Sequence, residues 1–180
     1  MVKLVGATAS IVAAAALVGC NDHSENLSVA HGRLHVHSTE ITVESHSGPE
    51  AHLYADGRLQ IGSDDVTLDS AGHAAVVGYF TAAKAMTQHG IDTAKAGAAV
   101  GVTAAKEVVQ GLAHGDTSKI GANVERKADV VRQAAAKICD DLGTIRGLQQ
   151  TLASSVESFR PYAAVSDDDV NDCRKGLTKD

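Results

Sequence analysis

The apolar side chains of this chain change their spacing at Asp69. Over 33–68 they recur at every second residue, which is the period of a strand with one buried face. Over 69–160, alanine-rich segments place apolar residues at helical spacing instead. We therefore expect an α+β fold, in which a small N-terminal antiparallel sheet is followed by helices and by a short C-terminal tail over 161–180.

The strand region predicts three or four strands. The pair Leu34 and Val36 and the pair Ile41 and Val43 occupy opposite sequence parities. A bulge or kink near 38–40 is therefore expected, because it would keep both pairs on one face.

The best-specified hairpin has an Asp-Gly pair at 56–57. A two-residue loop at this pair would place Leu53 on the wrong face. A three-residue loop over 55–57, with its glycine left-handed, pairs Leu53 with Leu59 and keeps one apolar face. A second turn at 62–65 then returns the chain to that face.

Glycine-containing breaks divide the helical part into three mostly long helices. Asp69 or Ser70 caps the first, and Gly90 is its expected stop. Gly143 and Gly147 are candidate interruptions of the third. The expected helices cover 70–90, 91–113 and 118–160.

Two residue patterns in these helices predict which faces contact other helices. Apolar residues seven apart in the third helix indicate contact along its length, and they are Val131, Ile138, Ile145, Leu152 and Phe159. In the second helix, Gly97 and Gly101 lie on a face of small residues. We expect that face to pack closely against another helix of the domain, with self-association as the alternative. Flanking charges, including Asp92 and Lys106, exclude a membrane span here.

The first twenty residues have the form of a bacterial lipoprotein signal. Lys3 supplies a positive start, and an uncharged apolar run follows over 4–18. Leu17-Val18-Gly19-Cys20 then matches a lipobox, in which cleavage after Gly19 leaves a diacylglycerated Cys20 as the new first residue. The run is about fifteen residues, shorter than the ~20 that a spanning helix needs. The alternatives are an ordinary signal peptide with a chance cysteine, or a short membrane helix.

The lipoprotein interpretation divides the chain into a signal peptide (1–19), a flexible tether (20–32) and one domain (33–180). Asn21 follows the lipidated cysteine, whereas an aspartate there would resemble the inner-membrane retention signal of enteric bacteria. We therefore expect an exported protein on the periplasmic face of the outer membrane, with the inner membrane as the alternative.

Two further cysteines, Cys139 and Cys173, form an even pair in an oxidising compartment. A disulfide between them requires the tail to run back antiparallel along the third helix. Two unpaired thiols, or pairing with another chain, are the alternatives.

Composition narrows the classes of partner. Formal charge is −6, and it becomes −7 once cleavage removes Lys3, the one charge in 1–19. An acidic chain without basic runs is not typical of nucleic-acid binding, and membrane contact would rest on the acyl chains of Cys20. Aromatic residues are only 3%, so the core is expected to be alanine-rich helices in close contact.

Nine histidines are many for 180 residues. His35 and His37 share a strand face, and His52 lies across the predicted sheet, so these three are candidate ligands for zinc or copper. Solvent-facing histidines on a half-buried sheet explain the same pattern. No cofactor is expected.

The chain carries no motif of a nucleophile elbow, phosphate loop or dinucleotide site. Its paired aspartates fit turn and helix-cap positions. We therefore expect no enzymatic activity and identify no small-molecule substrate.

Four short segments stand out along the chain, and they are Ala-Asp-Gly-Arg-Leu-Gln-Ile-Gly (55–62), Val-Thr-Leu-Asp-Ser (66–70), Lys-Ile-Cys-Asp-Asp-Leu (137–142) and Ser-Phe-Arg-Pro-Tyr (158–162). Together they resemble the YggN-like family of bacterial envelope proteins. The resemblance covers most of 33–162 and implies an exported α+β domain of a Gram-negative bacterium, without a known activity. With Cys20 lipidated, Cys173 is the expected partner of Cys139.

The expected function is thus a structural or interaction role in the envelope, with protein partners or further copies of the chain. A metal-binding module and a carrier of lipid or another hydrophobic ligand are the alternatives.

Overall fold

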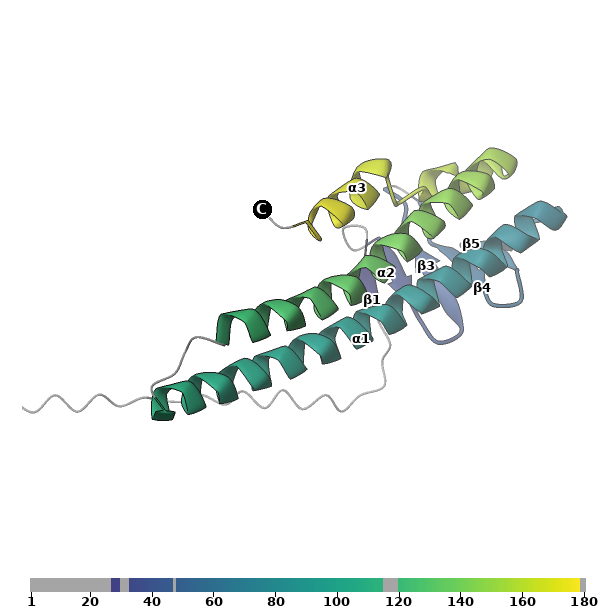
Figure 1. Cartoon of the computed structure of the whole chain (residues 1–180). Coiled ribbons are helices and arrows are strands. Elements are labelled where there is room, and N and C mark those ends of the chain that lie inside the picture. Colours follow the sequence, from purple (N-terminus) through teal and green to yellow (C-terminus); the bar gives the residue numbers. More distant parts are fainter. Residues whose placement is uncertain (1–26, 30–32, 47, 115–119, 179–180) are drawn as a thin grey trace, which may run out of the picture.

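The computed structural model describes residues 27–29, 33–46, 48–114 and 120–178. Figure 1 shows two long antiparallel helices side by side, α1 (Ser70–His114) and α2 (Ile120–Ser155). A sheet lies against one end of this pair, and a short helix, α3 (Asp167–Lys175), packs on α2. The α+β fold class is confirmed. None of the helices in these ranges combines the length and apolar composition that a bilayer span requires.

The sheet is a six-stranded antiparallel meander in which each strand pairs with its sequence neighbours. Its strands are β1 (Leu27–Val29), β2 (Leu34–Val36), β3 (Glu40–Val43), β4 (Ala51–Tyr54), β5 (Leu59–Ile61) and β6 (Asp64–Asp65). The two strands beyond the expected four are β1, inside the expected tether, and β6, inside the expected turn. They have three and two residues, too few for an alternating pattern to be visible in the sequence.

The turn between β2 and β3 corrects one expectation. Its cross-strand pairs are Leu34 with Val43 and Val36 with Ile41. The His37 N–H donates to the Glu40 carbonyl over 2.9 Å, which closes a tight turn around Ser38 and Thr39. The expected bulge near 38–40 is therefore wrong, because a complete reversal also changes the parity and leaves both pairs on one face.

The β4–β5 hairpin confirms the predicted three-residue loop. Leu53 lies opposite Leu59, and Gly57 is left-handed at φ +87°. Gly62, at φ +61°, opens the next turn. The Val66 N–H then donates to the Leu59 carbonyl over 2.9 Å, so the chain does return to the apolar face.

The core forms where that face meets the two long helices. Its sheet residues are all 1% exposed or less, and they are Leu34, Val36, Ile41, Val43, Ala51, Leu53 and Leu59. The largest fully buried helical residues are Val76, Tyr79, Met86, Ile145 and Leu152, joined by Phe159. Removing this apolar surface from water is the main force that holds sheet and helices together.

α1 does not stop at Gly90, so the expected division at 89–90 is wrong. A glycine inside a helix costs about 1 kcal/mol relative to alanine, and packing of α2 alongside offsets that cost. His89 Nδ1 lies 2.6 Å from Asp141 Oδ2, which ties the two helices together at this level. Gly143 and Gly147 likewise lie inside an uninterrupted α2.

The small-residue face is also not where α1 meets α2. A Cβ built on Gly97 or Gly101 would meet nothing within 4 Å, whereas one on Gly78 would lie 3.2 Å from a methyl group of Leu148. Gly78 is therefore the glycine at which the helices approach closely. The expectation for Gly97 and Gly101 is wrong because no described neighbour lies close against either glycine.

The heptad pattern of α2 does mark buried positions, but burial fades along it. Ile145, Leu152 and Phe159 are fully buried, whereas Val131 and Ile138 are only partly so. α2 ends at Ser155, and a 3-10 turn, η1 (Glu157–Tyr162), completes the segment that was expected to be helical to 160.

The C-terminal tail runs back along α2. Arg146 lies 2.7 Å from Asp167, and Arg174 lies 3.9 Å from Asp140, so α3 and α2 are antiparallel. The buried amide of Gln149 hydrogen-bonds the backbone of the tail. Cys139 and Cys173 form a disulfide with Cα atoms 5.6 Å apart, as expected from the cysteine count.

This disulfide is expected to contribute substantially to stability. It closes 34 residues of sequence, and the chain-entropy model assigns such a loop about 3–4 kcal/mol. The variant Cys139→Ala/Cys173→Ala should unfold in urea with its free energy of unfolding lowered by about that amount. Reductant should destabilise the parent chain and leave the variant unchanged, and equal stability of the two oxidised proteins would contradict this role.

The buried hydroxyl of Tyr79 makes the stability of the fold depend on pH. Its side chain is fully buried, its hydroxyl makes no hydrogen bond with any described residue, and burial raises its pKa. The folded state therefore keeps this proton at pH values where the unfolded tyrosine, with a pKa of about 10, loses it. Stability must then fall as pH rises above about 10.

Tyr79→Phe is expected to raise the free energy of unfolding by about 1 kcal/mol at neutral pH, because it removes an unpaired buried hydroxyl. It should also reduce the loss of stability above pH 10. Urea titrations at neutral and alkaline pH test both effects. Tyr54→Phe is the control at neutral pH, since that hydroxyl is partly exposed and donates to Gln60. The same alkaline loss in Tyr79→Phe and in the parent would refute this account.

Candidate functional site

The solvent-facing side of the sheet carries the histidines singled out by the sequence. His35 on β2, Thr42 on β3 and His52 on β4 lie opposite one another in register, and Gln60 on β5 continues the row. Antiparallel pairing places these four residues on the face opposite the apolar core, and Thr42 in their middle is itself only 5% exposed. The row therefore brings polar side chains of four strands together.

Each imidazole in this row faces a carboxylate. His35 Nε2 lies 3.1 Å from Glu44 Oε1. His52 Nδ1 lies 3.5 Å from Glu40 Oε2, and His52 Nε2 lies 4.0 Å from Glu50 Oε2. These side chains are partly exposed, so the contacts are weak surface interactions that order the row.

The three candidate metal ligands do not converge. His35 and His52 are two strands apart, roughly 10 Å at ~4.8 Å per strand, with Thr42 between them. A shared zinc ion would need their nitrogens within about 2 Å of it. His37 lies beyond His35, at the end of β2. Within the described ranges, no group of three or more His, Cys, Asp or Glu side chains is arranged to hold a metal ion.

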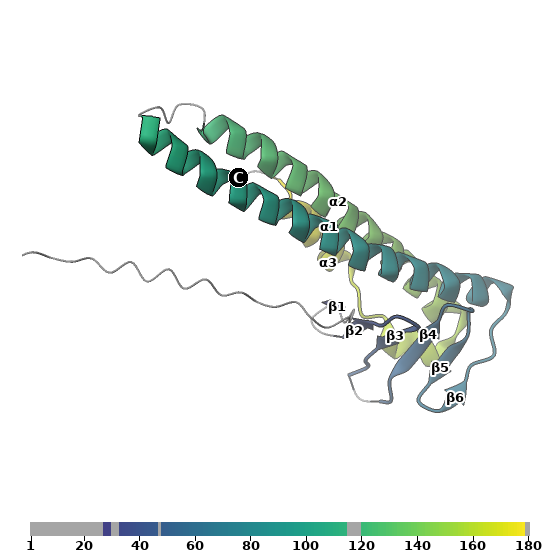
Figure 2. The same cartoon turned by 90° about the horizontal axis from the view of Figure 1, so that it is seen from below.

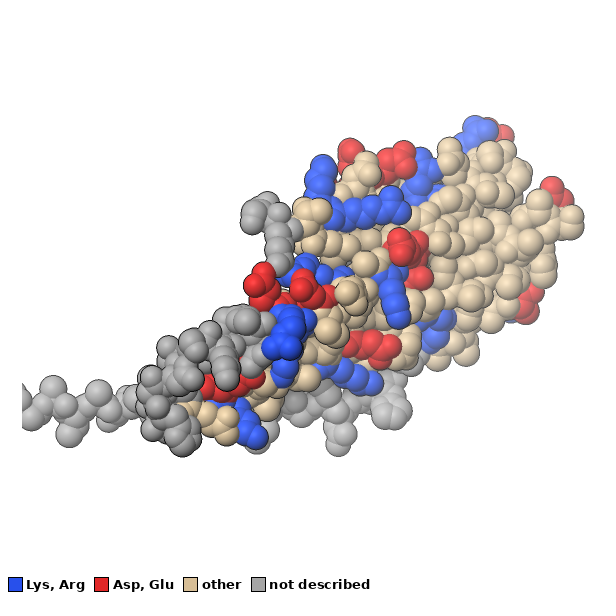
Figure 3. Space-filling model, viewed as in Figure 1, with Lys and Arg blue, Asp and Glu red and all other residues tan. Residues whose placement is uncertain are grey.

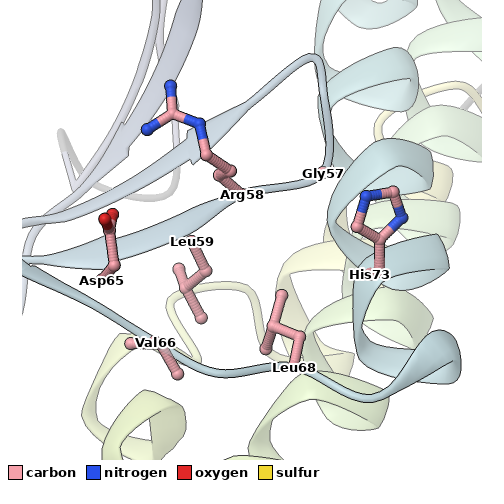
Figure 4. Close-up of a pocket in the computed structure, with 7 residues that line it drawn as sticks. All are labelled: Gly57, Arg58, Leu59, Asp65, Val66, Leu68 and His73. Atoms are coloured by element: carbon pink, nitrogen blue, oxygen red, sulfur yellow. The ribbon is translucent and has the colours of Figure 1, made fainter.

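A small cavity opens where the β4–β5 loop meets the start of α1, with a volume of about 230 Å³. Figure 4 shows Leu59 and Val66 on the inner side of the strands and Arg58 and Asp65 on the outer side. The Arg58 guanidinium donates to Asp56 over 2.9 Å, which lowers the pKa of that carboxyl, and it stacks on Tyr54. The cavity is below the ~300–1,000 Å³ of usual ligand pockets.

One wall of this cavity is set by a glycine. His73, from the first turn of α1, lies so close to Gly57 that a Cβ there would be 2.4 Å from its Nε2. Gly57 therefore serves two purposes, a left-handed turn and room for the imidazole. Sequence reasoning found the turn but missed this contact, since nothing in the spacing links residues 57 and 73.

A second hollow lies between the helices beyond the sheet, and it measures about 200 Å³. It is lined by Ala96, Ala99, Val100, Thr103, Lys127 and Val130. This part of the helix pair, α1 from Gly90 onward and α2 up to Ile138, projects past the sheet, and we call it the arm (Figure 2). Short side chains leave its two helices incompletely packed.

The arm exposes apolar side chains. Five large apolar residues of the described chain are exposed, all of them in the arm: Ile91, Val102, Val108, Val109 and Val130. In Figure 3 the charged residues of the viewed face are scattered rather than gathered in one patch. Gly19 and Cys20, the expected cleavage and lipidation residues, lie outside the described residues.

The contact between Gly57 and His73 can be tested. Gly57→Ala should lower the free energy of unfolding by about 1–3 kcal/mol, because it adds a left-handed alanine and a clash. Adding His73→Ala should restore only the part of the stability that the clash removes, because the left-handed alanine remains. Gly62→Ala is the matched control, also left-handed, with its nearest foreign atom at 3.1 Å. Urea denaturation of these three variants and the parent chain measures the effect. Full recovery of stability in the double variant would refute the part of the cost assigned to the left-handed backbone.

Comparison of the chain with family models, with curated proteins and with solved structures gives no match. The resemblance to the YggN-like family therefore rests on the sequence motifs alone.

Proposed function

We propose that this chain is an exported lipoprotein, anchored by acyl chains on Cys20 to the periplasmic face of the outer membrane. Its role there is structural or interactive rather than enzymatic. The observation that carries the proposal is the sequence Leu17-Val18-Gly19-Cys20 after a short apolar run. The Cys139–Cys173 disulfide supports it, because such bonds persist in oxidising compartments.

The arm is the part of the domain offered to partners. The sheet and the adjoining halves of α1 and α2 hold the fully buried core, whereas the arm contributes exposed apolar side chains. Exposed apolar side chains that gather in one part of a folded domain indicate a contact site. An anchor at residue 20 and a projecting arm would present that surface to other envelope components.

The polar row of the sheet supports a non-enzymatic role. Its histidines are engaged by Glu44, Glu40 and Glu50 at the partly exposed surface of the sheet. We therefore assign the row to the stability of the sheet surface.

Labelling with a palmitate analogue in a Gram-negative host, followed by separation of the two membranes, tests the anchor. The parent chain should be labelled and recovered with the outer membrane. Cys20→Ser should lose the label and leave the membrane fraction. Cys139→Ala/Cys173→Ala is the matched control and should keep the label. An unlabelled parent chain, or a labelled Cys20→Ser variant, would overturn the proposal.

A further inference from the structure

The side of α1 turned away from α2 in the arm carries a regular row of residues, all apolar except one lysine. Its residues follow one another at alternating spacings of four and three, and they are Ile91, Lys95, Ala98, Val102, Ala105 and Val109. We call this set the outer seam. The spacing is that of the core positions of a coiled coil, which place one residue per half-heptad on a single helix face.

The outer seam is exposed along its whole length. Ile91 is 39% exposed, Val102 72% and Val109 68%, and the other three members are exposed as well. A coiled-coil seam in this state is unsatisfied, because its apolar side chains gain free energy only when a second helix covers them.

No described element of the chain covers this seam. α2 packs on the opposite side of α1, where Ala96, Val100 and Thr103 face Lys127 and Val130 across the groove. α3 packs on α2, and the sheet lies at the other end of the helix pair, as the two views in Figures 1 and 2 show. Among the described residues the seam therefore has no cover, and a second helix from another molecule would supply one.

The outer seam is complementary to itself when two copies run antiparallel. If Ala98 of one copy faces Val102 of the other, then Lys95 faces Ala105 and Ile91 faces Val109. Each small side chain meets a larger one, and every contact occurs twice about a two-fold axis. A parallel alignment would instead place Lys95 against Lys95.

The residues beside the seam favour the same register. Asp92 and Lys106 flank it on one side, and the antiparallel register brings Asp92 of each copy beside Lys106 of the other. On the other side Gly101 meets itself at the axis, where its missing side chain allows the helices to approach. A Cβ built on Gly101 would meet no described neighbour within 4 Å. Asp92 accepts one hydrogen bond from Gln88, and its second oxygen can receive the lysine.

We propose that the outer seam of α1 binds a second copy of this chain, antiparallel, with Gly101 at the two-fold axis. This names the partner of the interaction surface and in that respect rests on the proposed function. The seam spans eighteen residue steps, about 27 Å at 1.5 Å per residue, so the pairing is modest in solution. Anchoring two copies to one membrane would strengthen it through effective concentration.

Cysteine cross-linking of the full chain tests the geometry. Gly101→Cys should form a disulfide-linked dimer under mild oxidation, because the two substituted residues meet at the axis. Gln133→Cys, exposed on α2 of the same arm, is the matched control and should give little dimer. The parent chain shows any background from Cys20. Equal yields from the two positions, or a cross-link from Gly101→Cys to a different protein only, would overturn the proposal.

Charge reversal tests the register by an independent measurement. Asp92→Lys and Lys106→Asp should each raise the dimer Kd by about tenfold, as two attractive pairs become repulsive. The double exchange should restore the parent Kd, and Lys137→Glu on α2 should leave it unchanged. Sedimentation of the detergent-solubilised full chain measures this. A monomer at all concentrations, or no rescue by the double exchange, would refute the antiparallel pairing.

The two proposals can fail separately. A chain that dimerises but takes up no palmitate leaves the pairing standing and removes the anchor. A labelled chain that stays monomeric, even when cross-linked in its membrane, leaves the anchor and removes the pairing.

Discussion

The apolar face of a narrow antiparallel sheet can be removed from water only if another layer covers it, and in this chain α1 and α2 form that layer. Leu34, Ile41 and Leu53 become fully buried only through this contact. The strands are short and could not hold a stable sheet by backbone pairing alone. The helices depend on the same contact, because their alanine-rich surfaces offer few other large side chains to bury.

The arm shows what the helices do where the sheet is absent. Beyond His89 and Asp141, which pair at its base, α1 has no fully buried side chain in the described range. Helical hydrogen bonding and contact between two helices with short side chains are enough to keep the hairpin extended. The outer side of α1 is left with exposed apolar side chains and no partner among the described residues, which is why we regard the arm as an interaction element.

The C-terminal tail connects the sheet to the helix pair. Tyr162 donates to the Pro49 carbonyl over 2.7 Å, and Arg33 donates to the Pro161 carbonyl over 3.1 Å, so the segment after α2 is tied to the sheet. The disulfide then fixes α3 to α2. A domain with a small core gains stability from such a covalent link without needing more apolar surface.

The sequence by itself determined the features that depend on neighbouring residues or on residue chemistry. Alternating apolar residues specified the sheet, the Asp-Gly pair specified the loop with Gly57 left-handed, and the cysteine count predicted the bond between Cys139 and Cys173. Strand alternation and the turn depend only on neighbouring residues, and two cysteines can form only one disulfide within the chain. Each of these features therefore allows few alternative structures.

Only the tertiary structure decided which helix faces are covered. An alanine-rich helix is apolar on several sides, so spacing alone could not show that α1 meets α2 through Gly78 rather than Gly97. For the same reason it could not show that α1 continues through Gly90, since the cost of that glycine is offset by a helix distant in sequence. The wide separation of His35 from His52 also depends on strand order. Covered and exposed faces follow from long-range packing, which a linear pattern does not encode.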